Sequence, residues 1–133
     1  MATFTFELVA PERVIHSGEV EAVVLPATEG DMTVLPGHAP MMTALKTGFL
    51  IVTDHKGHGQ RMLVRGGFAD VNPRGLTVLA ERALPAQELT PEILDREILQ
   101  AEMAYDATDD SAAKHAAESA VAQLREAKAA LAL

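Results

Sequence analysis

The residue types that could carry chemistry gather in the stretch EGDMTVLPGHAP, between Glu29 and Pro40. Glu29 and Asp31 lie two positions apart around a glycine, so in a strand their side chains would point the same way. Paired carboxylates can exchange protons with a substrate or bind a hard cation. His38 follows between two prolines, but no serine or further acid accompanies it in a recognisable catalytic arrangement. An exposed acidic turn followed by a stiff loop is therefore the favoured interpretation.

Two further patterns resemble ligand sites without completing one. His55 and His58 flank a turn and could bind a metal, but no third ligand follows at a compatible spacing, which favours a solvated loop. Lys46-Thr47-Gly48 has the residues of a phosphate-binding loop without the glycines that precede them. We therefore predict no catalytic residue, no metal site and no cofactor.

Composition excludes several classes of function. The net charge is −8 and lysine and arginine form no cluster, so a nucleic-acid backbone would be repelled. The absence of cysteine excludes disulfides and thiolate metal sites. No apolar run is long enough to span a bilayer, so we expect no direct membrane insertion. The opening MATFTFELV lacks the features of a leader peptide, and we expect none.

Residues 4 to about 82 follow the pattern of short strands. Apolar residues recur there with a period near two, in bursts such as FTFELV and EVEAVVLP. Turn residues separate the bursts, among them Ser17-Gly18, Gly66-Gly67 and Asn72 to Gly75. We therefore expect an all-β sandwich over residues 1–84.

The pattern changes to helices over residues 85–133. Thr90-Pro91 is a typical helix start, and Asp109, Asp110 and Ser111 are candidate caps of a second helix. The two predicted apolar stripes are Leu94, Ile98, Ala101 and Tyr105, then Ala113, Ala117, Ala120, Leu124, Ala127 and Leu131. Two helices joined by a short linker favour an antiparallel hairpin. A buried methyl group contributes only about 0.8 kcal/mol, so the alanine stripe predicts a weakly held hairpin.

Two motifs carry a resemblance to a known family. They are the LPGHAP block, with Pro36, Gly37, His38 and Pro40, and the GGFADV block, with Gly66, Gly67 and Phe68. In this order and spacing, the first 85 residues or so resemble the epsilon subunit of bacterial F-type ATP synthases. The resemblance implies a sandwich of about ten strands followed by a helical hairpin.

The resemblance also implies a function. Such subunits are non-catalytic parts of the central stalk, which couples ion-driven rotation to ATP synthesis on the catalytic head. They bind the gamma subunit and the ring of c subunits, as peripheral proteins on the cytoplasmic face of the bacterial plasma membrane. By this resemblance, Glu29, Asp31 and His38 are predicted contacts with the c ring, made through a loop that prolines stiffen before binding.

The hairpin raises the question of regulation. In some relatives it reaches the alpha and beta subunits and inhibits ATP hydrolysis, and in some it binds ATP through a short motif. Here Leu94 and Asp95 match that motif, but Ile98 stands where its arginine belongs, so we predict no tight ATP binding. From Leu84 onward the chain has ten acids against four lysines and arginines, which disfavours docking on an acidic loop of the head.

Two other classes of protein remain as alternatives. A free-standing regulatory binding module predicts a stable monomer without affinity for a gamma subunit. A small hydrolase that uses Glu29 and Asp31 predicts turnover by the isolated chain. Neither alternative explains why the LPGHAP and GGFADV blocks occur together in this order.

Overall fold

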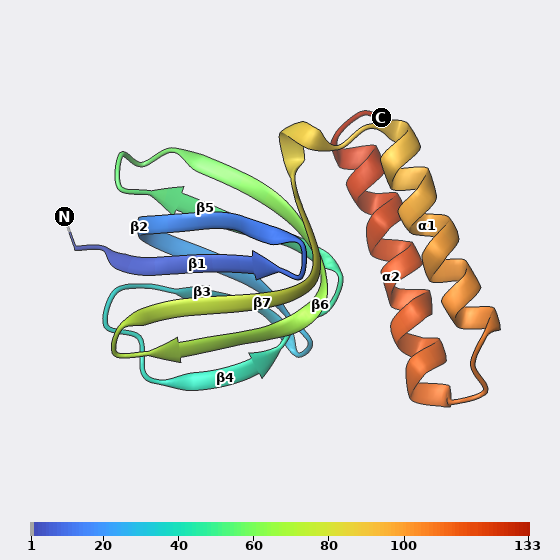
Figure 1. The fold of residues 1–133 in the computed structure, drawn as a ribbon, viewed down its shortest axis with the longest axis horizontal. Helices are drawn as coiled ribbons and strands as arrows, with labels where there is room; N and C mark the ends of the chain where they lie inside the picture. Colours follow the sequence, from blue (N-terminus) through green and yellow to red (C-terminus); the bar gives the residue numbers. More distant parts are fainter. Residues whose placement is uncertain (1) are drawn as a thin grey trace. The chain divides into compact units, whose positions relative to one another are not determined.

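The computed structural model describes residues 2–133, which form two compact units, one ending at Ala86 and the other beginning at Gln87 (Figure 1). The strands of the first unit are β1 (Phe4–Ala10), β2 (Arg13–Ala27), β3 (Gly30–Val34), β4 (Met41–Ala44), β5 (Gly48–Asp54), β6 (Gly59–Asn72) and β7 (Gly75–Pro85). A short 3-10 helix, Ala86–Glu88, precedes the helices α1 (Pro91–Asp106) and α2 (Ser111–Ala130). The predicted order, a sandwich and then a two-helix hairpin, is confirmed.

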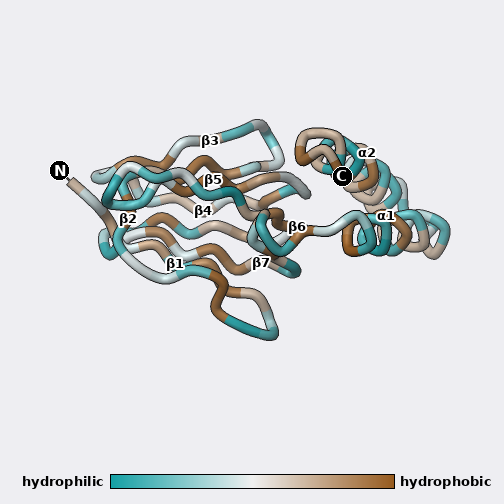
Figure 2. The backbone as a smooth tube through the Cα atoms, turned by 90° about the horizontal axis from the view of Figure 1, so that it is seen from above, coloured by the Kyte–Doolittle hydropathy of each residue, from teal (hydrophilic) through white to brown (hydrophobic). Residues whose placement is uncertain are grey.

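The strands of the first unit close into a ring. Along the sheet the order is β1-β7-β6-β5-β2-β3, and β2 also pairs with β1, while β4 pairs with β6. The β1–β7 pair is parallel and the other pairs are antiparallel. Apolar and polar residues alternate along these strands, as the colours of Figure 2 show. The apolar set lies inside, where Phe6, Leu8, Leu25 and Leu50 are fully buried.

The sandwich has seven continuous strands, whereas about ten were expected. The long strands β2, β6 and β7 change partners along their length: the first half of β2 pairs with β1, and its second half pairs with β3 and β5. Counting each of these bent strands once per layer accounts for the difference. The predicted turns at Ser17-Gly18 and Gly66-Gly67 were wrong, because both dipeptides lie inside strands.

Gly67 shows why a glycine pair bends β6 without ending it. Its φ of 116° lies in a region that other residues rarely adopt. A Cβ atom at this position would come 2.1 Å from the carbonyl oxygen of Leu79 on β7. Pairing with β7 nevertheless continues on both sides of the bend, from Arg65 with Arg82 to Phe68 with Leu79. The dipeptide therefore changes the direction of the strand and lets the neighbouring backbone approach closely.

The second unit is an antiparallel pair of capped helices. The Thr90 hydroxyl accepts a hydrogen bond of 3.2 Å from the Ile93 N–H, and Pro91 follows at the first helical position, as predicted. Of the three candidate caps of α2, Asp110 is the one that acts: its carboxylate accepts a hydrogen bond of 2.8 Å from the Ala113 N–H.

The predicted apolar stripes are confirmed only in part. On α1, Leu94 and Ala101 are buried, Ile98 is half-buried and Tyr105 is exposed, while Glu97, which was not predicted, is buried. Tyr105 lies in the last turn of α1, where the Lys114 ammonium is 4.1 Å from the centroid of its ring, a cation–π contact.

On α2, more of the predicted apolar stripe is buried than on α1. The residues Ala117, Ala120, Leu124 and Ala127 are buried. Ala113 is exposed and Leu131 is half-buried, because they lie in the first turn and just beyond the end of the helix. The buried contact is thus built mainly from methyl groups, each of which contributes about 0.8 kcal/mol.

Every lysine and arginine of α2 reaches across to α1. Lys128 Nζ lies 2.7 Å from the Asp95 carboxylate, and Arg125 lies 3.5 Å from Glu102. The third, Lys114, donates a hydrogen bond of 2.9 Å to the Tyr105 carbonyl. Exposed ion pairs contribute roughly 0.2–1 kcal/mol each, so these contacts supplement the small apolar contact between the helices. Neither helix is both long and apolar enough to cross a membrane, within the residues described.

Candidate functional site

The structure does not bring the three predicted contact residues together. Glu29 lies in the turn before β3 and Asp31 near its start, where it pairs with Pro26. His38 lies in the loop that follows the end of β3 at Val34. A strand of five residues is about 16 Å long, so Glu29 and Asp31 are at one end of the sandwich and His38 at the other (Figure 1).

The loop around His38 is a turn held by hydrogen bonds within the loop. The His38 N–H donates a hydrogen bond of 3.1 Å to the Leu35 carbonyl, and Gly37 between them has a φ of 82°. Nδ1 of the His38 ring lies 2.8 Å from the Ala39 carbonyl. A tautomer with its proton on Nδ1 donates this bond, which fixes the direction of the ring.

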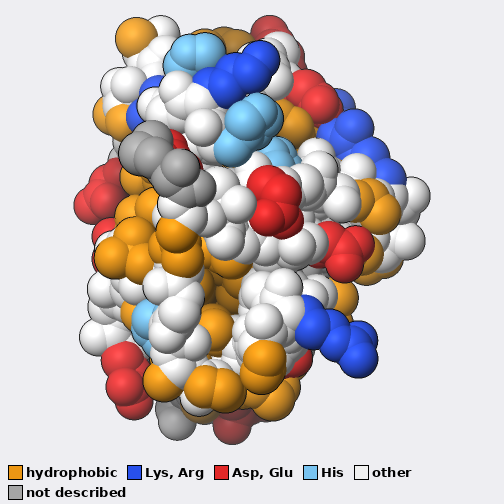
Figure 3. Space-filling view, turned by 90° about the vertical axis from the view of Figure 1, so that its left-hand side faces the viewer, with side chains coloured by type: hydrophobic (Ala, Val, Ile, Leu, Met, Phe, Trp, Pro, Cys, Tyr) orange, Lys and Arg blue, Asp and Glu red, His pale blue; other side chains and the backbone are white. Residues whose placement is uncertain are grey.

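A cavity of about 260 Å³ lies beneath this loop. It is lined by Phe4, Val34, Leu35, Gly37, His38, Ala39, Pro40, Val71, Asn72, Pro73 and Gly75. None of these lining residues carries a carboxylate or a hydroxyl, so His38 has no partner there for acid–base or nucleophilic chemistry. Figure 3 views the molecule from this side and shows hydrophobic side chains gathered around a hollow. The arrangement suits contact with another molecule better than catalysis.

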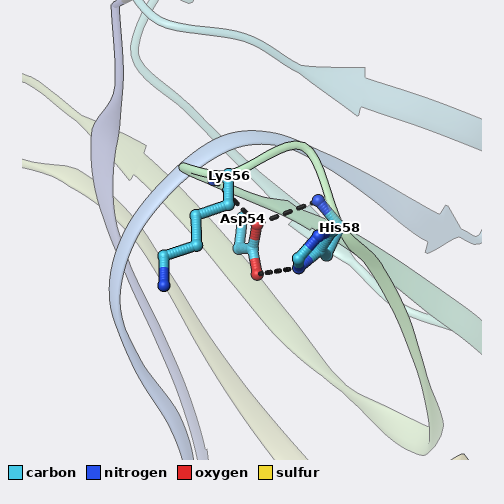
Figure 4. A network of polar contacts seen from close by, with 3 residues as sticks. All are labelled: Asp54, Lys56 and His58. Carbon is cyan, nitrogen blue, oxygen red and sulfur yellow. Dashed lines mark hydrogen bonds and ion pairs between the residues drawn. The ribbon is translucent and has the colours of Figure 1, made fainter.

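The turn with two histidines is held by a carboxylate. The Asp54 Oδ1 atom accepts hydrogen bonds of 2.9 Å from the backbone N–H groups of Lys56 and His58, and His58 Nδ1 lies 3.9 Å from Oδ2 (Figure 4). The His58 N–H is the main reason why the pKa of the Asp54 carboxyl is lowered. His55 and His58 are exposed, and the described residues contain no group of three or more metal-ligating side chains. The geometry is that of a solvated turn.

His16 is a half-buried histidine that the sequence did not single out. Its ring lies 5.3 Å from the Phe6 ring, and its Nδ1 atom is buried without a hydrogen-bond partner. Burial lowers the pKa of His16, and the nearby Asp54 carboxylate opposes this effect. The environment therefore favours the neutral imidazole.

Phe68, the last residue of the GGF motif, leads to a surface that sequence reasoning missed. Strand register places Phe68 opposite both Ala44 and Leu79, and places Val9 opposite both Leu79 and Val14. Residues opposite one another in a sheet point to the same face. We call this set the apolar row; it runs across five strands and consists of Val14, Val9, Leu79, Phe68 and Ala44.

The apolar row is open to solvent. Val14 is 56% exposed, Phe68 56% and Leu79 57%. A contiguous set of exposed apolar side chains of this kind is typical of a protein–protein contact. The sequence contains these apolar residues at outward-facing positions of strands in which buried and exposed residues alternate. The row could not be assembled without the register, because the five residues come from five strands.

The position that resembles an ATP motif is already occupied by the protein's own side chains. The Asp95 carboxylate is paired with Lys128, and Ile98 is half-buried. An isoleucine offers no donor to a phosphate.

Comparison with known proteins identifies the family. The family described as "ATP synthase, Delta/Epsilon chain, beta-sandwich domain" matches residues 3–86. The ATP synthase epsilon chain of Parvibaculum lavamentivorans is 47% identical over 114 residues, which cover 85% of this chain and 86% of that protein. This chain belongs to the ATP synthase epsilon chain family. The epsilon chain of Rhizobium meliloti is 50% identical over 96 residues, which cover 72% of each chain.

Solved structures of ATP synthases contain chains similar to this epsilon-family protein. A chain in the mitochondrial ATP synthase of Euglena gracilis, in a structure of OSCP, F1 and the c-ring, has a TM-score of 0.74 and 28% identity, and the match covers 98% of this chain and 82% of that one. A chain in the central stalk and c-ring structure from Tetrahymena thermophila has a TM-score of 0.68 at 16% identity, covering 95% of this chain and 96% of that one. The second similarity concerns the fold alone.

Proposed function

We propose that this chain is the non-catalytic epsilon subunit in the central stalk of an F-type ATP synthase. In that role it turns with the gamma subunit and the c ring, and couples their ion-driven rotation to ATP synthesis on the catalytic head. Family membership supports the assignment, and the absence of a catalytic partner around His38 is consistent with it. The subunit is then held at the cytoplasmic face of the bacterial plasma membrane by its partners.

The main structural support for a contact with a partner subunit is the apolar row. Its three most exposed members present more than half of their surface to water, which is costly unless a partner covers them. Four of its five strands, β1, β2, β6 and β7, belong to the closed ring, so the row is largely rigid before binding. We assign it to the gamma subunit, because a rotor part must be held firmly by the shaft with which it turns.

Glu29, Asp31 and His38 are the proposed contacts with the c ring. Because β3 separates the first two from His38, they form two points of contact rather than one patch. Single substitutions Asp31→Ala and His38→Ala should then weaken retention of the catalytic head on membranes independently, and their effects should add in the double variant. A variant that leaves retention unchanged removes its residue from the contact.

The hairpin is proposed to act separately from the sandwich, with residues 1–84 serving the rotor and residues 85–133 serving regulation. In this regulatory role the hairpin would reach the alpha and beta subunits of the catalytic head. The acid surplus of the hairpin disfavours a stable contact with an acidic loop, so we assign it a weak inhibitory effect at most.

Co-purification tests the proposal. The full chain is mixed with the gamma subunit and catalytic head of the same organism, and we expect one-to-one capture. Phe68→Ser combined with Leu79→Ser should reduce capture, whereas Ile51→Ser, at an exposed apolar position of β5, should not. Lack of capture by the unmodified chain would overturn the rotor role. Normal capture of the Phe68/Leu79 variant would overturn only the assignment of the apolar row.

A further inference from the structure

The apolar row has acidic neighbours along one side. Two positions from Val9, Leu79, Phe68 and Ala44 along their strands lie Glu7, Thr77, Asp70 and Met42. These four residues also lie opposite one another, since Thr77 pairs with both Glu7 and Asp70, and Asp70 pairs with Met42. Residues two apart in a strand point to the same face. A second row, with two carboxylates, therefore runs beside the apolar row at a distance of about 7 Å.

Glu19 on β2 extends this acidic surface. It pairs with Thr5, which comes two residues before Glu7 on β1 and points to the same face. Glu7 and Glu19 are exposed, and Asp70 is half-buried. We call Glu7, Glu19 and Asp70 the acid flank.

The protein holds two of these carboxylates with uncharged donors. Glu19 accepts hydrogen bonds from the hydroxyl groups of Thr5, at 2.6 Å, and Thr3, at 3.0 Å. The Thr5 hydroxyl is the main reason why the pKa of the Glu19 carboxyl is lowered. Asp70 accepts a hydrogen bond of 3.4 Å from the Asn72 side-chain amide. These donors position the carboxylates and leave their negative charge in place.

The other side of the apolar row has no such excess of acid. The residues two positions beyond Leu79 and Ala44 are Glu81 and Lys46, one charge of each sign. The two sides of the row therefore differ in charge, and a partner that lies on the row can distinguish them.

The acid flank disfavours the free protein. Glu7 and Glu19 are diagonal neighbours on the paired strands β1 and β2, about 7–8 Å apart, and like charges at this distance repel. Asp70 is two strands away from Glu7, or about 10 Å. Lysines or arginines of a bound partner would cancel this repulsion, so the charges favour the complex over the free chain.

We propose that the segment of the gamma subunit that covers the apolar row carries lysines or arginines along one side, which face the acid flank. This inference rests on the proposed contact between the apolar row and the gamma subunit, and adds the charge of the partner and the direction in which it lies. Apolar contacts at the centre of an interface hold the complex, while charges at its rim speed the encounter and fix the register.

Association kinetics test the charge of the partner. The catalytic head with its gamma subunit is immobilised without this chain, and the full chain is passed over it at about 0.05 M and 0.5 M salt. Association of the unmodified chain should be slower at the higher salt concentration, because salt screens the attraction. Glu7→Lys with Asp70→Lys should slow association about tenfold at low salt and remove or reverse the salt effect.

Matched variants separate the acid flank from the general charge of the protein. Glu21→Lys is the control for Glu7→Lys, because it makes the same change of charge in the same unit, with its carboxylate near Gly57 in the β5–β6 turn. It should leave the association rate nearly unchanged. Glu7→Gln with Asp70→Asn removes both charges with little change of shape, and should slow association about threefold if the lysine variant does not fold.

The outcomes distinguish this inference from the function on which it rests. If the unmodified chain does not associate, the contact with the gamma subunit fails, and the inference fails with it. If the chain associates at a rate that neither salt nor the charge variants change, the contact stands and the basic partner surface is overturned. An effect of Glu21→Lys as large as that of Glu7→Lys would overturn it as well.

Discussion

Phe68 of β6 lies directly opposite Leu79 of β7, and both side chains are more than half exposed. Gly67, next to Phe68 in the chain, lets the backbone of β6 approach the Leu79 carbonyl closely. The pair forms the centre of the apolar row, between Ala44 on one side and Val9 on the other. A glycine motif that shapes the sheet therefore also presents a contact surface.

The two phenylalanines Phe6 and Phe68 should differ sharply in their effect on stability. Phe6 is fully buried, and Phe6→Ala should lower the free energy of unfolding by about 3–5 kcal/mol, through lost burial and the cavity left behind. Phe68→Ala should change it by roughly 0.5 kcal/mol or less, as at other surface positions. Chemical denaturation of both variants measures the difference. A large loss for Phe68→Ala would mean that this side chain serves the fold rather than a partner.

Gly67→Ala should destabilise the sandwich. The new Cβ atom would meet the Leu79 carbonyl oxygen at 2.1 Å, at a φ of 116° that alanine rarely adopts. We expect a loss of at least about 1–3 kcal/mol in the free energy of unfolding, the usual cost of such strain. Gly59→Ala is the matched control within β6, because a Cβ atom there meets nothing within 4 Å. Equal stabilities of the two variants would contradict the close approach.

The sequence predicted the elements better than their connections. Alternation and turn residues located the sandwich, and the Thr90-Pro91 start located α1, because these signals are local. The glycine pair at 66–67 was misread as a turn, since the same freedom that ends a strand also lets it bend while its pairing continues. Only the register with β7 distinguishes the two cases.

The candidate site shows the same limit. Glu29, Asp31 and His38 are neighbours in sequence and were grouped for that reason, but the extended β3 strand between them carries them apart. Val14 and Phe68 are far apart in sequence, and pairing brings them into one row. Contacts of this kind depend on the topology of the sheet, which periodicity does not specify.

The chain should not bind ATP tightly. A nucleotide phosphate needs a positively charged or N–H donor, and Ile98 supplies neither. The neighbouring Asp95 is paired with Lys128 at 2.7 Å, so a nucleotide would have to compete for that lysine. Calorimetric titration of the full chain with ATP should give no measurable heat of binding beyond dilution. A micromolar site would contradict this prediction.

Removal of residues 85–133 should change ATP hydrolysis by the catalytic head only slightly. The hairpin is rich in acids, and like charges oppose its insertion at an acidic surface. The assay compares the head complex with the full chain and with the shortened one. Glu126→Lys, at an exposed position of α2, tests the electrostatic reason, because adding positive charge should increase inhibition. A large rise in hydrolysis on removal of the hairpin would show that it inhibits despite its charge.

His16 should make the sandwich less stable in acid. Burial lowers its pKa in the folded protein below the ordinary value of 6.5, so the unfolded chain binds the proton more readily. The free energy of unfolding should therefore fall as the pH drops through 6.5, and level off once the pH is below the folded-state pKa. His16→Gln removes the titrating group and should flatten this part of the profile, measured by denaturation between about pH 8 and pH 5. The exposed His115→Gln is the matched control and should keep the wild-type slope. A His16→Gln profile as steep as that of the wild type would mean that other groups cause the acid sensitivity.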